Sequence, residues 1–393
     1  MTTARRTAVW FVVLLGLVSL FADVTYEAAR GINGPYLAIL GASATAVGLV
    51  SGLGELLGYG LRIVSGIWSD KTRRYWTFTI VGYAVNLLAV PLMALAGRWE
   101  WAIGLILMER IGKSIRTPAR DAMLSHATSV VGRGWGFALH EAMDQIGGMT
   151  GPIVVSVILA WKQNYALAFG VLAIPAVLAL ATLVTARAIY PRPQEMESKW
   201  AHQGRGRFSP LFWLYTGAIG LAAMAYADFP LMAYHIKSNH LVSDAWIPLL
   251  YAGAMGIDGV AALIFGRLYD RFGTPVLMGA FAISCGFAPL AFSENIIWVI
   301  AGLALWGIGL GAIESVVRAA VAGLVPQDRR ATGYGLFNTG FGVAWFIGSA
   351  AMGAMYDHWR TGLVWFSVIG QLGCIAVLAV FHRKEKAGRE AAV

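Results

Sequence analysis

Long apolar runs, each bounded by glycine, proline or charged residues, follow one another along the whole chain. At about 20 residues each, they are long enough to cross a hydrocarbon core of about 30 Å as helices. The sequence lacks the short alternating segments that a membrane barrel needs. The pattern therefore predicts an all-α membrane protein with about twelve transmembrane helices. The predicted spans are 8–29, 46–67, 77–97, 101–121, 134–160, 165–186, 210–233, 245–268, 275–292, 297–320, 331–353 and 361–381.

A six-residue pattern, Gly followed four residues later by Asp and then a basic residue, occurs twice at an offset of 200 residues. The two copies are Gly66-Ile67-Trp68-Ser69-Asp70-Lys71 and Gly266-Arg267-Leu268-Tyr269-Asp270-Arg271. Other landmarks recur in the same order at nearly the same offset: Ala22-Asp23 and Ala227-Asp228, Arg120 and Arg318, Gly134-Trp135-Gly136 and Gly333-Tyr334-Gly335. The chain therefore consists of two parallel sequence repeats, an organisation known from membrane transporters. The predicted parts are a six-helix half at 1–190, a cytoplasmic linker at 191–209, a second half at 210–382 and a cytoplasmic tail at 383–393.

Composition and charge agree with a membrane location. Apolar residues make up 58% of the chain and charged residues 13%, and the mean hydropathy is +0.64. The net charge of +9 comes mostly from Lys and Arg in short stretches between spans, on one side of the predicted membrane. By the positive-inside rule, we expect a multi-pass protein of the inner (plasma) membrane with both termini cytoplasmic. Because membrane orientation explains the positive charge, we expect no binding of nucleic acid. We expect a monomer that interacts with the lipid bilayer, protons and a small-molecule substrate.

The loop after the second span carries a Gly, an Asp four residues later and then basic residues: Gly66, Asp70, Lys71, Arg73 and Arg74. This pattern resembles the cytoplasmic signature of the major facilitator superfamily. Arg73 stands where the family usually has a Gly, whereas the second copy keeps Gly273 but has Thr274-Pro275 in place of the basic pair. The resemblance implies two pseudo-symmetric six-helix halves that work by alternating access.

Two further features carry the resemblance. Arg110 on the fourth span is similar to the family's intramembrane arginine. Gly147-Gly148-Met149-Thr150-Gly151-Pro152 on the fifth resembles the core of a pattern common in its proton antiporters, although Ala138, Val155 and Ser156 depart from the rest of that pattern. We therefore expect gating roles for Gly147, Gly151 and Pro152, and for a pair of cytoplasmic latches formed by Asp70, Lys71, Arg74, Asp270 and Arg271.

Ionisable groups inside a bilayer cost at least a few kcal/mol each, so those within spans are functional candidates. At 1.5 Å per residue, Glu55, Arg110, Lys113, Asp144 and Asp258 come out near the bilayer middle, where transporters bind substrate and coupling ions. Candidates for proton coupling are the carboxylates Asp144, Glu55, Asp23, Glu27 and Asp258. For Glu55 a static pair with Arg62 is an alternative.

On the fourth span, Glu109, Lys113, Arg116 and Arg120 share one helix face. This stripe either attracts an anionic group or, for Arg116 and Arg120, merely snorkels or pairs with loop acids. The fifth span supplies further site candidates in His140, Glu141 and Asp144. An Asp144 that faces Arg110 or Lys113 can serve in proton coupling, or it can form a static buried ion pair.

Asp23, Glu27 and Arg30 are spaced i, i+4 and i+7 on the first span, beside Tyr26. Asp228, Met232 and His235 repeat this spacing on the seventh span, where Pro230 predicts a kink. The two outer clusters either meet as an extracellular gate or, in the second copy, bind a metal ion, which Pro230 disfavours. On the eleventh span, Asn338, Phe341 and Trp345 share a face for substrate binding or for core packing.

The sequence has no Gly-rich phosphate-binding loop and no nucleophile–base constellation, so it predicts neither an ATP-driven pump nor an enzyme. Its two cysteines, Cys285 and Cys374, lie within apolar runs, and no cofactor or metal centre is expected. We expect proton-coupled export of a small organic or amphipathic solute. The alternatives are proton-coupled uptake of an organic anion or metal chelate, and a membrane receptor or assembly factor that keeps the fold without transport.

Overall fold

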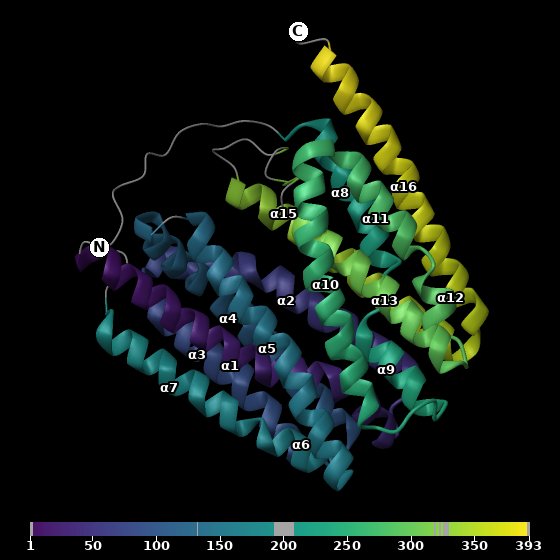
Figure 1. The fold of residues 1–393 in the computed structure, drawn as a ribbon, viewed down its shortest axis with the longest axis horizontal. Coiled ribbons are helices and arrows are strands. Elements are labelled where there is room, and N and C mark those ends of the chain that lie inside the picture. Colours follow the sequence, from purple (N-terminus) through teal and green to yellow (C-terminus); the bar gives the residue numbers. More distant parts are fainter. Residues whose placement is uncertain are drawn as a thin grey trace. The chain divides into compact units, whose positions relative to one another are not determined.

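The structure is a computed structural model that describes residues 3–131, 133–191, 208–317, 320–321, 324 and 330–390. Within these residues the chain forms helices and contains no strand (Figure 1). The first seven helices are α1 (Thr3–Ile39), α2 (Ala44–Thr72), α3 (Tyr75–Leu92), α4 (Trp99–Val131), α5 (Arg133–Lys162), α6 (Tyr165–Val171) and α7 (Ala173–Ile189). The later ones are α8 (Pro210–Met224), α9 (Phe229–Ser238), α10 (Trp246–Phe272), α11 (Thr274–Ser284), α12 (Phe287–Ala291), α13 (Ile296–Ala312), α15 (Arg330–His358) and α16 (Arg360–Glu390).

Most of these helices have the length and polarity of membrane spans. In the described part of the chain, 10 segments are long and apolar enough to cross a membrane. Two more helices are long enough at 1.5 Å per residue: α4 with 33 residues, which carries the charges of the predicted fourth span, and α15 with 29. The predicted all-α membrane fold is confirmed, and the helices are consistent with the twelve expected spans.

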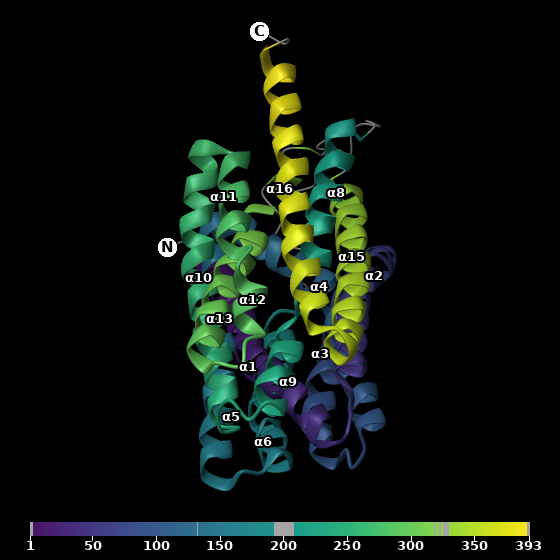
Figure 2. The same cartoon turned by 90° about the vertical axis from the view of Figure 1, so that its right-hand side faces the viewer.

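The chain divides into two compact units. Unit 1 comprises Met1–Gly41, Leu57–Ala201 and Asp244–Ala252, and unit 2 comprises Ala42–Leu56, His202–Ser243 and Gly253–Val393. In unit 1, α1 packs against α5 and α7, and α3 packs against α4 and α7. In unit 2, α8 packs against α15 and α16, α12 packs against α13, and α11 against α16; Figure 2 shows α16 running beside α8. The neighbours correspond helix by helix, so the repeat in the sequence is also a repeat of packing.

The seventh predicted span, 210–233, is two helices instead of one kinked helix. α8 ends at Met224 and α9 begins at Phe229. Asp228 caps α9 by accepting a 3.0 Å hydrogen bond from the Phe229 amide, and Pro230 occupies the first turn, where its missing N–H is no loss. The predicted span 165–186 is likewise divided at Leu172, between α6 and α7. A cap and a proline thus mark the start of α9, whereas Leu172 offers no side-chain cap for α7.

Each of the two signature loops has a residue with positive φ near its end. Arg73 has φ 52° just before α3, and Gly273 has φ 69° just before α11. Gly adopts positive φ without strain, whereas an L-residue such as Arg does so at about 1–2 kcal/mol. Arg73, which departs from the family pattern, thus shares the positive φ of Gly273.

Candidate functional site

A cluster of charged side chains lies within unit 1, between α1, α4 and α5. Asp23 and Tyr26, one turn apart on α1, are 5% and 8% exposed, and the Tyr26 phenol donates a hydrogen bond to Oδ1 of Asp23. Four charged groups act on the Asp23 carboxylate: Asp144, Lys113, Glu27 and Arg116. No cation of the described residues forms an ion pair with Asp23 within 4.0 Å. Asp23 is a buried carboxylate that faces cations without touching them.

Glu27, one turn further along α1, is held from two sides. Its Oε1 lies 4.0 Å from Nζ of Lys113 on α4, and its Oε2 accepts a 2.5 Å hydrogen bond from Tyr251 on α10. Arg30 and Arg110 also attract this carboxylate. Nζ of Lys113 lies 3.9 Å from the centre of the Tyr26 ring, a cation–π distance. Lys113 therefore connects Glu27 with the residue that holds Asp23.

Arg116 is 1% exposed, although it lies toward the end of the predicted span. Its guanidinium carbon is 4.2 Å from the centre of the Tyr83 ring on α3 and 5.6 Å from that of Tyr26. The interpretation that Arg116 snorkels to the surface is wrong, because the close contact of α3 with α4 encloses the side chain. Arg116 is thus the second cation, after Lys113, that acts on the Asp23 carboxylate.

Asp144 on α5 has partners other than the predicted ones. Its Oδ2 lies 3.4 Å from Nδ1 of His140, and Arg120 is the nearby cation of α4. Arg120 itself pairs with Asp121 at 2.8 Å and donates a 3.2 Å hydrogen bond to the Ser19 hydroxyl. The expectation that Asp144 faces Arg110 or Lys113 is therefore wrong. The α4 stripe is long, and α5 meets it nearer to Arg120.

Arg110 is tied to its neighbour on α4. Its Nε lies 3.2 Å from Oε2 of Glu109, while the Asn86 amide of α3 donates a 2.7 Å hydrogen bond to Oε1 of Glu109. Both carboxylate oxygens of Glu109 are thus occupied, and Arg110 has a partner whether or not a ligand is bound. This arrangement suits a structural pair better than a free substrate contact.

The glycine pattern of α5 sets the distance between α5 and α1. A Cβ added at Gly147 would lie 2.8 Å from Cβ of Asp23, and one added at Gly151 would lie 3.0 Å from Cα of Val24. Pro152 is buried next to them. These residues let the α5 backbone approach α1 at the level of Asp23, and their expected gating role stays a prediction.

Unit 2 contains the two remaining carboxylates that the sequence suggests for proton coupling. Glu55 on α2 is 8% exposed and Asp258 on α10 is 1% exposed. Asp258 acts electrostatically on Tyr226, whose phenol donates a hydrogen bond to the carbonyl of Trp306. Both carboxylates are buried, and their expected role in proton coupling stays a prediction.

The predicted aromatic face of α15 forms part of a row of rings in unit 2. Phe341 and Trp345 are 6% and 5% exposed, with ring centres 5.4 Å apart, and Tyr226 lies 6.1 Å from Trp345. Asn338 is half-buried one turn away. The indole N–H of Trp345 has no hydrogen-bond partner among the described residues. Core packing explains the rings, whereas that N–H is available to a ligand.

Asp228 and His235 of α9 have separate local roles. Asp228 is the cap of α9, while Nδ1 of His235 lies 2.9 Å from the Tyr356 hydroxyl and Nε2 lies 2.9 Å from the Ser293 carbonyl. No group of three His, Cys, Asp or Glu side chains that could hold a metal ion occurs in the described residues. The metal alternative for Asp228, Met232 and His235 gains no support from this geometry.

The loop residues expected to act as latches are described only in part. Lys71, Arg74 and Arg271 are exposed, and the guanidinium of Arg271 lies 5.1 Å from the centre of the Phe272 ring. The side chains of Asp70, Asp270 and Glu141 lie outside the described part of the structure. Their predicted roles stay predictions.

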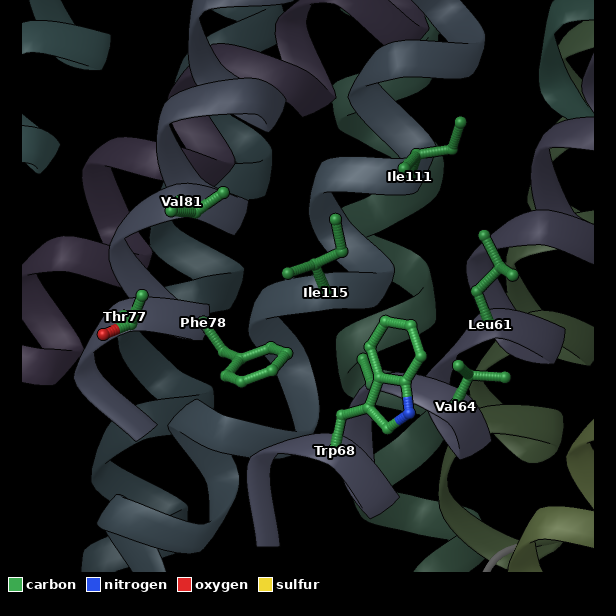
Figure 3. A pocket seen from close by; sticks show the side chains of 9 residues that line it. Leu61, Val64, Trp68, Thr77, Phe78, Val81, Ile111 and Ile115 are labelled. Atoms are coloured by element: carbon green, nitrogen blue, oxygen red, sulfur yellow. The ribbon is translucent and has the colours of Figure 1, made fainter. Parts of the chain in front are cut away.

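An apolar groove of about 310 Å³ lies in unit 1 between α2, α3 and α4 (Figure 3). Leu61, Val64 and Trp68 face Phe78 and Val81 across it, with residues of α4 between them. Trp68 is 60% exposed, so the groove opens on the surface of the structure. It uses faces of α3 and α4 other than those that carry Tyr83 and Arg116.

Comparison with known proteins identifies the family. The family model described as Major Facilitator Superfamily matches residues 13–256 and 214–392. The chain belongs to this superfamily. An uncharacterised protein of Mycobacterium tuberculosis is 42% identical over 90% of this chain and 89% of its own length. An uncharacterised MFS-type transporter of Methanocaldococcus jannaschii is 27% identical over 88% of both chains.

Solved structures of the superfamily share the fold. The nucleoside transporter NupG matches with a TM-score of 0.72 at 13% identity, over 95% of this chain and 98% of its own. A mutant of the peptide transporter POT in complex with sulfate matches with a TM-score of 0.73 at 14% identity, over 96% of this chain and 94% of its own. The suspected major facilitator membership is confirmed, and family and fold indicate a transporter instead of an enzyme.

Sequence reasoning missed two neutral members of the cluster in this major facilitator protein. Tyr251 lies in an apolar run of the second half, and Tyr83 lies in the apolar third span. A tyrosine in such a run carries no charge that would single it out. The only usable signal is that a buried phenol usually finds a polar partner.

Proposed function

We propose that the chain is a proton-coupled secondary active transporter of a small organic solute. The Asp23 carboxylate is the observation that carries this proposal, because it is buried, held by Tyr26 and faces cations without an ion pair among the described residues. A carboxyl group in such a place can take up and release a proton as its charged neighbours move or acquire a ligand. Membership of a transporter superfamily supports the transport function in general.

Three carboxylates and their facing charges form the coupling system in this proposal. In it, Asp23 carries the proton. Glu27 shifts its interaction between Lys113 and Tyr251, and the charge of Asp144 is influenced by its contact with His140. The charged or titratable groups around them come from α1, α3, α4, α5 and α10: Tyr26, Arg30, Tyr83, Arg110, Arg116, Arg120, His140 and Tyr251. Rocking of the helices during alternating access changes these distances and so couples the proton to the solute.

Export is the direction we propose first. The α5 glycine pattern resembles that of proton antiporters, and Gly147 packs directly on Asp23. Multidrug resistance protein MdtH of Proteus mirabilis is 23% identical over 88% of both chains, and its name supports the same direction. The second candidate is proton-coupled uptake of an organic anion, which the buried Arg116 and Lys113 favour.

The test uses the full chain in proteoliposomes with imposed pH gradients and a panel of labelled organic cations, anions and amphipathic drugs. Accumulation driven by acid inside the vesicles supports antiport, and accumulation driven by acid outside supports uptake with the proton. Asp23→Asn and Asp144→Asn should abolish gradient-driven accumulation while solute exchange continues. Glu100→Gln, at an exposed acid whose side chain is 46% accessible, is the control and should change nothing. Unaltered gradient-driven transport in Asp23→Asn contradicts its coupling role, and absence of any solute exchange favours the receptor alternative.

A further inference from the structure

The contact between α3 and α4 in unit 1 contains buried polar atoms that have no hydrogen-bond partner. They are Nε and Nη1 of Arg116, the hydroxyl of Tyr83 and the hydroxyl of Thr79, counted over the described residues. Arg116 is 1% exposed, and Tyr83 and Thr79 are fully buried. Thr79 and Tyr83 are four residues apart on α3, so they share one helix face. Two unmatched hydroxyl groups thus share the face of α3 whose Tyr83 ring lies against Arg116.

Arg116 is held there firmly. Its guanidinium stacks on Tyr83 at 4.2 Å, and a Cβ added at Gly82 of α3 would lie 2.7 Å from Cβ of Arg116. The close approach of α3 to α4 agrees with the burial of the Arg116 side chain, which is 1% exposed. The guanidinium carbon lies over the Tyr83 ring, while Nε and Nη1 have no hydrogen-bond partner among the described residues.

This arrangement leaves a charge without a counter-ion in contact. Asp23 attracts Arg116, but no carboxylate of the described residues lies within 4.0 Å of it. Leaving a buried charged donor unsatisfied is more costly than leaving a neutral one, and an anion removes that cost by accepting charge-assisted hydrogen bonds. Arginine suits carboxylate and phosphate groups in particular, since its planar guanidinium presents several donors at once.

We propose that Arg116, Tyr83 and Thr79 form a subsite for the anionic group of the transported solute, a carboxylate or a phosphate ester. The proposal rests on the transport function above and names its substrate class. Arg116 supplies the charge, and the two hydroxyls donate to the same oxyanion. The apolar groove of Figure 3 lies on other faces of α3 and α4 and plays no part in it.

The test measures binding to the purified full chain by thermal unfolding and by titration. The probes are acetate, benzoate, inorganic phosphate and phenyl phosphate, with acetamide, benzamide and phenol as uncharged partners. We expect saturable stabilisation by the carboxylates or by the phosphates, and the two groups of probes tell these sources apart. We expect none from the uncharged partners. If no oxyanion stabilises the wild-type chain, the subsite does not exist.

Variants then assign the binding to Arg116. Arg116→Gln should weaken oxyanion binding by about tenfold or more, the factor that corresponds to losing one hydrogen bond to a charged group. Arg116→Lys keeps the charge and should bind with intermediate affinity, which preserves the test if Arg116→Gln folds poorly. Tyr83→Phe should weaken binding while the ring stays in place. Arg98→Gln, at a side chain that is 74% exposed, is the matched control. Equal affinity in wild type, Arg116→Gln and Arg116→Lys overturns the proposal.

Failure of this inference can be told from failure of the transport function. Proton-driven movement of an uncharged solute, unchanged in Arg116→Gln, removes the subsite and leaves the transporter. Conversely, Arg116-dependent binding of an oxyanion that no pH gradient ever moves keeps the subsite and removes proton coupling.

Discussion

The phenol of Tyr251 donates a 2.5 Å hydrogen bond to Oε2 of Glu27, 224 residues earlier in the chain. The other oxygen of the same carboxylate, Oε1, lies 4.0 Å from Nζ of Lys113. One carboxylate therefore joins α10 to α1 and α4 within unit 1. A movement that carries Tyr251 away from α1 would break this bond, so Glu27 is well placed to register it.

The bond between Tyr251 and Glu27 can be measured by a double-mutant cycle. Tyr251→Phe removes only the hydroxyl and should destabilise the protein by about 1.5–3 kcal/mol, the range for a hydrogen bond to a charged group. In a Glu27→Gln background the same change should cost less, because the charged acceptor is gone. Thermal and denaturant unfolding of the four proteins gives the coupling energy. A coupling energy near zero means that the hydrogen bond does not form in the membrane protein.

The close approach of α5 to α1 predicts different effects at two adjacent glycines. Gly147→Ala places a Cβ 2.8 Å from Cβ of Asp23 and should destabilise the fold by about 1–3 kcal/mol through overpacking. Gly148→Ala meets only Cγ of Glu27 at 3.9 Å, an ordinary contact, and should be neutral or slightly stabilising. Unfolding temperatures and solute exchange in proteoliposomes are the two readouts. Similar behaviour of the two variants would show that helix propensity, and not the contact with Asp23, governs this stretch.

The positive φ near the end of each signature loop predicts opposite effects on stability when Gly273 gains a side chain and Arg73 loses one. Gly273→Ala should destabilise by about 1–2 kcal/mol although nothing lies within 4 Å of the new Cβ, because φ is 69°. Arg73→Gly should instead stabilise by about 0.5–1 kcal/mol by relieving φ 52°. Gly266→Ala, at a signature glycine with open space and no positive φ, serves as the control and should not destabilise. The comparison is made by thermal unfolding, and a harmless Gly273→Ala would contradict the backbone argument.

Asp357 of α15 caps the start of α2 within unit 2. Its Oδ2 accepts hydrogen bonds of 2.8 Å from the Thr45 amide and 2.6 Å from the Thr45 hydroxyl, and its Oδ1 accepts one of 3.2 Å from the Ala44 amide. Asp357→Ala should cost about 0.5–2 kcal/mol, as expected for a lost helix cap. Thr45→Ala removes only the hydroxyl bond and should cost less.

The control for the Asp357 cap is Glu294→Gln, at an acid whose side chain is 81% exposed. Unfolding temperature is the first measurement, and thiol labelling of single cysteines near Thr45 reports whether this end of α2 opens. If Asp357→Ala unfolds and labels like wild type, the cap contributes nothing to the stability of this end.

Much of the charged cluster could be anticipated, because a buried charge in an apolar run is conspicuous in a sequence. Asp23, Glu27 and Lys113 were singled out in this way, and the structure brings them together. The partner of each charge could not be anticipated. Spacing says which residues share a face of one helix, but Asp144 meets His140 and Arg120 because of how α5 crosses α4, and no local pattern encodes that crossing.

The internal repeat and the all-helical membrane fold can be read from the sequence, because the length of apolar runs and the recurrence of motifs do not depend on packing. Three facts came only from the folded chain: Tyr251 reaches Glu27, Arg116 is enclosed with unmatched N–H groups, and Arg73 takes a positive φ. These facts depend on helix crossing and on close approach between backbones. Such geometry is the sum of many weak contacts between segments distant in the chain, and no single stretch of sequence contains it.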